Sequence, residues 1–281
     1  MEIMKPKKVR RDFKSVFMKK GTCSNTLFYI LNRESGHLKE NEERAADPLA
    51  GGLMQTGHQC GMLWGSTLAV GAEAFRRQGK NRDQAIAAAI TATQHLVEAF
   101  SKTARSVDCR DITGCDFNSK LGLWKAFFFG RFIRCFALVD KWAPEAIRSA
   151  KEGLSRGQTD LPPMPISCAS EVAQRMGASD EEMVMVAGFA GGIGLSGNAC
   201  GALAAAIWMN TLVWCKKHPG KTPPYFNNPN TKNTLKEFLG ATDAKILCHE
   251  ITGKYFKTIG EHADFIKNNG CDKLMQVLAR S

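Results

Sequence analysis

Apolar side chains recur at helical spacing in several stretches of the chain. Residues 83–106 are rich in strong helix formers, and their apolar positions, from Ile86 to Phe100, can share one buried face. Residues 232–239, 245–252 and 272–279 also fit helices, with Gly253 placed to end the second of them. Ser179 and Glu182 form a capping-box sequence at the start of another helix. No stretch alternates as a half-buried strand does, so the pattern predicts an all-α fold.

The longest apolar stretch is interrupted by glycine. Residues 183–215 carry no charged side chain, and that length is enough in principle to cross a bilayer. Glycines at 188, 191, 192, 194 and 197 divide the stretch in the middle. We therefore expect two buried helices joined by a glycine-rich turn and no transmembrane span.

The chain contains an internal duplication, which is the most informative feature of the sequence. Residues 50–63 read AGGLMQTGHQCGML and residues 190–203 read AGGIGLSGNACGAL, with seven of 14 positions identical. Further along, CRDITG at 109–114 corresponds to CHEITG at 248–253. Each copy carries four cysteines in the same order, with offsets that drift from 145 to 136: Cys23, Cys60, Cys109 and Cys135, then Cys168, Cys200, Cys248 and Cys271. Glycines and prolines at 153–165 predict a boundary between domains 1–152 and 153–281.

Composition and charge narrow the class of protein. The net charge is +11, of which residues 1–20 supply +6 as a basic arm. This arm has no interleaved aromatic residues and no recognition motif, so nucleic-acid binding is not expected, whereas peripheral contact with an anionic membrane stays open. No signal peptide is visible, and a cytoplasmic location is expected. In that reducing compartment, ten cysteines indicate metal ligation or thiol redox chemistry and not a disulfide scaffold.

The cysteine positions restrict the chemistry further. Cys23 and Cys168 precede apolar helical runs, and Cys60 and Cys200 are each followed by glycine, so all four are expected at helix N-termini. A helix N-terminus lowers the pKa of a thiol and favours the thiolate that binds metals and attacks disulfides. No C-x-x-C pair is present, so a metal site would have to collect its ligands from separate helix ends. His58 and His249 stand close to cysteines and are further candidate ligands, each without a counterpart in the other copy.

The order of these motifs resembles the C_GCAxxG_C_C family of redox-active proteins, whose members are about half this length. The match covers roughly residues 13–147 and 160–281. It departs from the family pattern at Met62, where the motif has Ala, and at Ala205, where it has Gly. The resemblance implies a helical, redox-active protein, and related members are associated with iron–sulfur binding.

Three functions compete at this point. The first is an iron–sulfur protein for electron transfer or redox sensing, with a redox partner protein and with the eight duplicated cysteines as ligands. One [2Fe–2S] or [4Fe–4S] cluster would sit in each copy, or the copies would share clusters across a seam. The second is a metal-free thiol–disulfide redox protein. The third is a zinc-stabilised module that recruits a partner through the basic arm or through the aromatic run at 124–136. A homo-oligomer is compatible with all three, and the sequence identifies no enzymatic reaction.

Overall fold

The chain folds as an all-helical bundle, as the sequence predicts. The computed structural model describes residues 9–79, 81–115, 132–155, 165–224 and 228–281. Its helices in the first copy are α1 (Phe13–Lys20), α2 (Cys23–Ser35), α3 (Glu40–Ala45), the 3-10 turn η1 (Asp47–Leu49), α4 (Gly61–Gln78), α5 (Arg82–Ala104), α6 (Cys109–Thr113) and α8 (Phe132–Ser155). Those in the second copy are α9 (Cys168–Arg175), α10 (Asp180–Ala187), α11 (Gly201–Lys217), α12 (Pro229–Ala241), α13 (Cys248–Thr252), α14 (Ile259–Lys267) and α15 (Asp272–Arg280).

The helices follow local signals of the sequence with one exception. The helix expected over 83–106 is α5, and the capping box forms as predicted between Ser179 and Glu182 at the start of α10. Gly253 ends α13 in the left-handed conformation, with φ of 68°. The prediction of a helix over 245–252 was wrong in its first turn, because Leu247 is extended and pairs with Ala199 in an isolated β-bridge.

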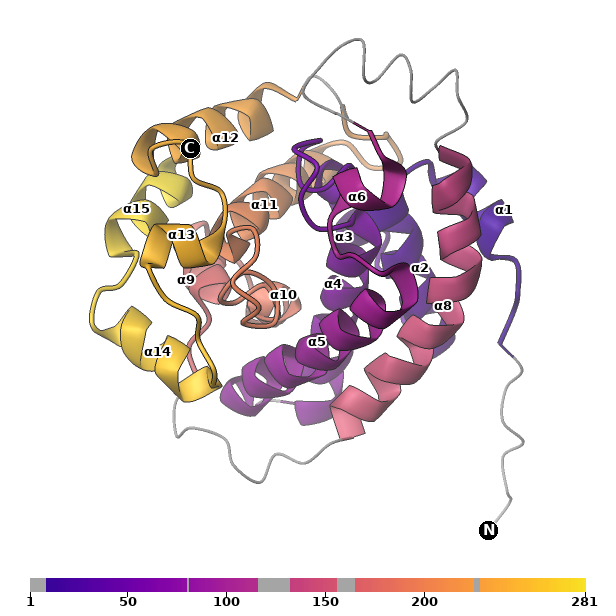
Figure 1. The fold of residues 1–281 in the computed structure, drawn as a ribbon, viewed down its shortest axis with the longest axis horizontal. Helices are drawn as coiled ribbons and strands as arrows, with labels where there is room; N and C mark the ends of the chain where they lie inside the picture. The colour runs from indigo at the N-terminus through magenta and orange to yellow at the C-terminus, as the bar shows by residue number, and fades with distance from the viewer. Residues whose placement is uncertain (1–8, 80, 116–131, 156–164, 225–227) are drawn as a thin grey trace.

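The two copies are arranged with approximate twofold symmetry. In each copy the helix that begins with the first cysteine packs on the helix that follows the second, as α2 does on α4 and α9 does on α11. Figure 1 shows α1 and α8 at one edge of the bundle and α12, α14 and α15 at the opposite edge. The copies meet reciprocally, because α10 packs against α4 and its counterpart α3 packs against α11.

Two hydrophobic core clusters each contain residues of both copies. The ring of Trp64 at the start of α4 meets Phe189 of the second copy edge-on, with centroids 4.8 Å apart. Gly71 lets α10 come close to α4, since a Cβ at this position would lie 2.4 Å from the carbonyl oxygen of Val184. The duplication has therefore produced two units that bury each other's apolar surface.

Three further expectations concern a membrane span, the basic arm and the aromatic run. No helix in the described ranges is long and apolar enough to cross a membrane. Residues 1–8 of the basic arm and residues 124–129 of the aromatic run lie outside the described residues. Phe136, the last aromatic of that run, packs against Phe17 with ring centroids 4.8 Å apart.

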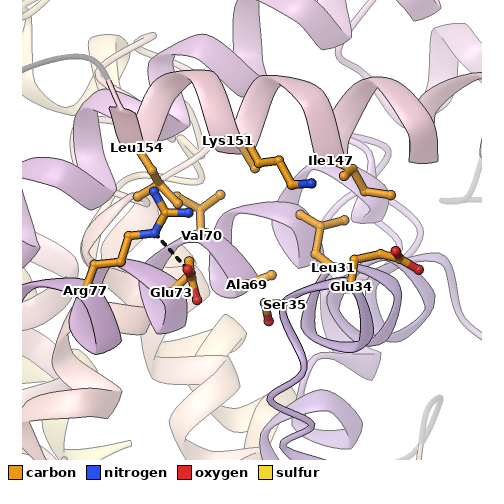
Figure 2. A pocket seen from close by; sticks show the side chains of 11 residues that line it. Leu31, Glu34, Ser35, Ala69, Val70, Glu73, Arg77, Ile147, Lys151 and Leu154 are labelled. Carbon is orange, nitrogen blue, oxygen red and sulfur yellow. Dashed lines mark hydrogen bonds and ion pairs between the residues drawn. The ribbon is translucent and has the colours of Figure 1, made fainter. Parts of the chain in front are cut away.

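The first copy also contains an apolar pocket that holds no cysteine. It lies between α2, α4 and α8 and has a volume of about 90 Å³. Figure 2 shows Leu31, Val70 and Leu154 facing this space, with the Glu73–Arg77 ion pair at its rim. This pocket is separate from the cysteine sites described below.

Candidate cysteine sites

Seven of the eight duplicated cysteines lie at the start of a helix. Cys60, Cys200 and Cys271 are the N-cap residues of α4, α11 and α15. Cys23, Cys109, Cys168 and Cys248 are the first residues of α2, α6, α9 and α13, and Cys135 is the fourth residue of α8. The predicted placement at helix N-termini is therefore confirmed for Cys23, Cys60, Cys168 and Cys200, and Cys109, Cys248 and Cys271 share it.

Backbone pairing brings the second and third cysteines of each copy together. The N–H of Cys60 donates to Val107 O at 2.8 Å, and the N–H of Cys109 donates to His58 O at 2.7 Å. The second copy repeats both bonds, since Cys200 N donates to Ile246 O and Cys248 N donates to Asn198 O. Gln59 and Asp108 form the isolated β-bridge between these segments in the first copy. Cysteines about 50 residues apart in sequence thus become neighbours.

A left-handed turn precedes each of these pairs. Residues 51–55 all have positive φ, and so do residues 191–195. The turn closes through the same bond in both copies, from Gly57 N to Gly51 O and from Gly197 N to Gly191 O. A side chain at Gly52 would overlap the backbone of His58 at 2.4 Å. Such a run of positive φ is costly for residues other than glycine, which explains the duplicated glycines.

The turn also supports the sulfur of the first cysteine. The backbone N–H groups of Gly51 and Ser24 act to lower the pKa of Cys23, as those of Gly191 and Ala169 do for Cys168. A Cβ on Gly61 would lie 2.5 Å from Cys23 Sγ, so the start of α4 rests directly against this sulfur. The glycine-rich segment thus holds the first cysteine of its copy by close backbone contact.

The first site contains one thiol that is poised to ionise. A hydrogen bond from the Cys60 thiol, together with the backbone donors, lowers the pKa of Cys23 below its ordinary value despite burial. The pKa of Cys60 is raised, because its proton is held by Cys23 and its surroundings are apolar. Burial is also the main cause that raises the pKa of Cys109, and it raises that of Cys135 to about 12. Cys115 also acts electrostatically on Cys109 and Cys135, so a fifth cysteine of the first copy lies near this site.

The second site has four cysteines around one cavity. Cys168, Cys200, Cys248 and Cys271 all line a cavity of about 20 Å³, which is room for roughly one water molecule. Burial is the main cause that raises the pKa of each of the four, to about 12 in the case of Cys271. The expectation that helix N-termini keep Cys60, Cys168 and Cys200 as thiolates was therefore wrong. At these three positions, desolvation of the sulfur outweighs the helix dipole.

A histidine that the sequence did not single out belongs to the second site. His262 lines the same cavity, is 1% exposed, and has a pKa lowered to about 4 by burial. Its Nδ1 lies 3.1 Å from Ile166 O, which makes Nδ1 the donor in the neutral ring. Neither His262 nor Cys115 has a counterpart in the other copy, so the two sites differ chemically. Comparison of the two copies could not identify these residues, because each of them occurs in one copy only.

The two histidines that the sequence did single out take other roles. His249 Nδ1 lies 2.8 Å from Gly197 O, and its ring stacks on Tyr255. Its counterpart Arg110 likewise donates to the carbonyl oxygen of Gly57, so both side chains brace the left-handed turn. Arg110 of the first copy and Glu250 of the second copy both act electrostatically on His58, which places His58 at the seam between the copies. Neither histidine lines the second cysteine cavity.

The donor set suits a soft metal or an iron–sulfur cluster. Four thiols per copy, presented by separate helix ends and shielded from water, are the ligands that such clusters use. Within the described residues, no group of three or more potential ligands has the geometry of a closed metal site. The sulfurs and their neighbours would therefore have to shift when a cluster binds in a cavity of this size. All ten cysteines are free thiols, so each site can make that adjustment.

The comparisons with known proteins agree with this arrangement. The sequence model of the family described as "Putative redox-active protein (C_GCAxxG_C_C)" matches residues 22–144 and again residues 167–281. No curated protein and no solved structure matches the chain. The two matched stretches contain one complete set of four cysteines each. The chain therefore belongs to the C_GCAxxG_C_C family of redox-active proteins and carries two tandem copies of the family's unit.

Proposed function

We propose that each four-cysteine site binds an iron–sulfur cluster and that the protein transfers electrons or senses redox state. One observation carries the proposal, which is that four cysteines from four separate helix starts converge on one cavity in the second copy. The first copy repeats the same four positions and the same backbone bonds. Bound to four thiolates, a [2Fe–2S] or [4Fe–4S] cluster supplies one-electron transfer.

The protein itself contributes three features to this chemistry. Burial excludes water from the sulfurs and, together with repulsion between neighbouring thiolates, keeps most thiols protonated until a cation arrives. Backbone N–H groups from the left-handed turns donate to Cys23 and Cys168, and such bonds to cluster sulfurs tune a reduction potential. Free thiols throughout support a reducing compartment such as the cytoplasm, where an unidentified redox partner would act.

The test is metal and sulfide analysis of protein purified without oxygen. We expect about four to eight iron atoms per chain, with matching sulfide, for two filled sites. Cys200→Ser is expected to remove about half of the iron. Cys215→Ser is the matched control, because Cys215 is also buried but has no counterpart and neighbours Arg44 and Asp47 instead of the cysteine sites. Zinc in place of iron would contradict the proposal and indicate a zinc-stabilised structural module. A protein without metal would also contradict it and indicate thiol–disulfide chemistry.

A second candidate function rests on the pair Cys23 and Cys60. The hydrogen bond between these thiols and the lowered pKa of Cys23 are the arrangement of a reactive thiolate beside a resolving thiol. In a metal-free thiol–disulfide protein, mild oxidation would join the two in a disulfide without loss of fold. Peptide mapping after oxidation checks this. A Cys23–Cys60 disulfide that forms and is reduced reversibly in fully iron-free native protein would favour this candidate over a cluster protein.

A further inference from the structure

A surface hollow lies against the second cysteine site. Its volume is about 500 Å³. The lining residues after α13 are Lys254, Tyr255 and Phe256, and those in α14 or at its C-cap are Glu261, Asp264, Phe265 and Asn268. Two of its residues, Phe256 and Phe265, also line the cavity that holds the four cysteines. A single layer of two phenylalanine rings therefore separates the hollow from the sulfurs. The ring centroids of the pair are 5.2 Å apart.

The hollow offers a fixed aromatic platform. Tyr255 is 64% exposed, which is unusual for a large apolar ring, and it lines the hollow. One side of its ring stacks on His249, with centroids 4.6 Å apart and planes within 15°. The hydrogen-bond contact between His249 Nδ1 and Gly197 O fixes the position of the His249 ring in this stack. Because Tyr255 stays 64% exposed with His249 stacked on it, part of its ring is open to a further planar ring.

The polar groups around the hollow indicate an uncharged ligand. Glu261 and Asp264 supply two carboxylates and Lys254 supplies one ammonium group. A phosphate-bearing carrier would meet a net negative rim, whereas N–H and O–H donors of a neutral molecule would find acceptors there. Lys254 Nζ lies 5.4 Å above the centre of the Phe265 ring, from where it can donate to a ring carbonyl. The volume falls in the range of sites for small-molecule cofactors.

From this geometry we infer that the hollow binds an uncharged, planar heteroaromatic redox carrier of the flavin type, stacked on Tyr255 against the wall of the second cysteine site. The electron-delivering role of such a ligand rests on the cluster proposed above, whereas its binding does not. In each transfer the reduced carrier loses one electron to the oxidised cluster and one proton to solvent. The cluster then gains one negative charge, and no other reactant is consumed. The first copy is not expected to bind the carrier, because the sequence after Cys109 has Asp116 at the position that corresponds to Tyr255.

Riboflavin is the probe for this inference, and quenching of its fluorescence is the measurement. We expect saturable quenching with one riboflavin per full-length chain, in metal-free and in iron-containing protein alike. Tyr255→Ala is expected to weaken the affinity at least tenfold, because it removes the stacking platform from an exposed position. Tyr255→Phe keeps the ring and is expected to bind riboflavin as the wild type does. Tyr29→Ala in the first copy is a control that should leave the affinity unchanged.

The outcomes separate this inference from the proposed function. Quenching that does not saturate, or equal affinity in wild type and Tyr255→Ala, overturns the inference even when the protein contains iron. If the protein contains no iron but binds riboflavin through Tyr255, the ligand site is supported and only the cluster proposal is overturned. In iron-containing protein, photoreduced riboflavin should bleach the cluster absorbance at least tenfold faster in wild type than in Tyr255→Ala. Equal bleaching rates at subsaturating riboflavin would contradict the placement of the ligand beside the second site.

Discussion

Gln59 joins the two copies beside both cysteine sites, because its Oε1 accepts a hydrogen bond from Ala199 N at 2.9 Å. The two residues immediately precede Cys60 and Cys200. The same side chain donates from Nε2 to Asp108 Oδ1 at 2.8 Å, and it is fully buried. One side-chain amide therefore joins three segments at the seam, namely its own and those of Asp108 and Ala199.

We predict that Gln59→Ala destabilises the protein by about 1–3 kcal/mol, since a buried N–H and a carboxylate lose their partner. Urea unfolding followed by circular dichroism measures the change. Gln276→Ala is the control, because Gln276 also bonds an aspartate, Asp272, but on an exposed helix surface. Equal stability of the two variants would contradict a structural role for the Gln59 bridge.

The sulfurs of each site come from one copy only. The thiols that raise the pKa of Cys109 belong to the first copy, and those that raise the pKa of Cys248 belong to the second. We therefore predict that Cys60→Ser removes the centre of the first copy and leaves the other intact. Electron paramagnetic resonance of the reduced protein distinguishes one centre from two. Loss of both signals in a folded variant would show instead that the copies share clusters across the seam.

Local signals in the sequence predicted the helices and the cysteine positions well. Cys60 and Cys200 cap helices because glycine follows each of them, and Cys23 and Cys168 open helices behind polar caps at Thr22 and Ser167. These features depend on a few neighbouring residues, and each of them occurs in both copies of the duplication. The all-α class follows from the same local information.

Features that depend on distant contacts were not predictable in this way. The bridge at Leu247 shortened a predicted helix, because pairing with Ala199 extends the backbone there. His262 enters the second site through tertiary packing of α14, and no motif marks it. The ionisation of Cys60 and Cys200 was predicted wrongly, since the helix dipole is local whereas desolvation depends on the whole core.

Gly61 tests the close contact between α4 and the first sulfur. A Cβ at Gly61 would lie 2.5 Å from Cys23 Sγ and 2.8 Å from Ala50 Cα, so Gly61→Ala must displace the sulfur or the turn. We predict a loss of about half of the bound iron and a lower free energy of unfolding. Gly240→Ala is the matched control, because Gly240 lies in α12 with open space around it. There alanine should leave the iron content unchanged and stabilise the helix by about 0.5–1 kcal/mol. Full iron in Gly61→Ala would contradict the contact.

Cys23 is predicted to be the most reactive of the eight duplicated thiols in metal-free protein. Its lowered pKa gives a larger thiolate fraction near neutral pH, whereas Cys168 in the second copy has a raised pKa because burial dominates there. Alkylation with iodoacetamide over a range of pH, followed by peptide mass spectrometry, measures both rates. Cys60→Ala removes the hydrogen bond that is the largest cause of the shift, so the alkylation profile of Cys23 should move to higher pH. An unchanged profile would show that the backbone donors alone set its reactivity.

Asp47 makes the stability of the first site depend on pH. This carboxyl is 2% exposed, and Oδ1 accepts hydrogen bonds from Thr22 Oγ1 at 2.6 Å and from Asn25 Nδ2 at 3.2 Å. Burial is the largest cause of the shift and raises the pKa of Asp47 to about 6, although the two hydrogen bonds and the nearby cations of Lys20 and Arg44 act in the opposite direction. Thr22 caps the helix that begins with Cys23, so this carboxyl supports the first sulfur through one intervening side chain.

The direction of the pH effect follows from the raised pKa. The folded protein holds the Asp47 proton more tightly than the unfolded chain, whose aspartates have a pKa of about 3.9. The contribution of Asp47 is therefore most favourable below about pH 4 and falls as the pH rises to about 6, by about 3 kcal/mol in total. Asp47→Asn keeps an oxygen that can accept both bonds and carries no charge, so it should be more stable than wild type at pH 8 and lose that advantage near pH 4. Urea unfolding of metal-free protein at the two pH values measures this, with the exposed Asp243→Asn as control. If Asp47→Asn and wild type differ equally at both pH values, the carboxyl titrates alike in the folded and unfolded protein and the raised pKa is wrong.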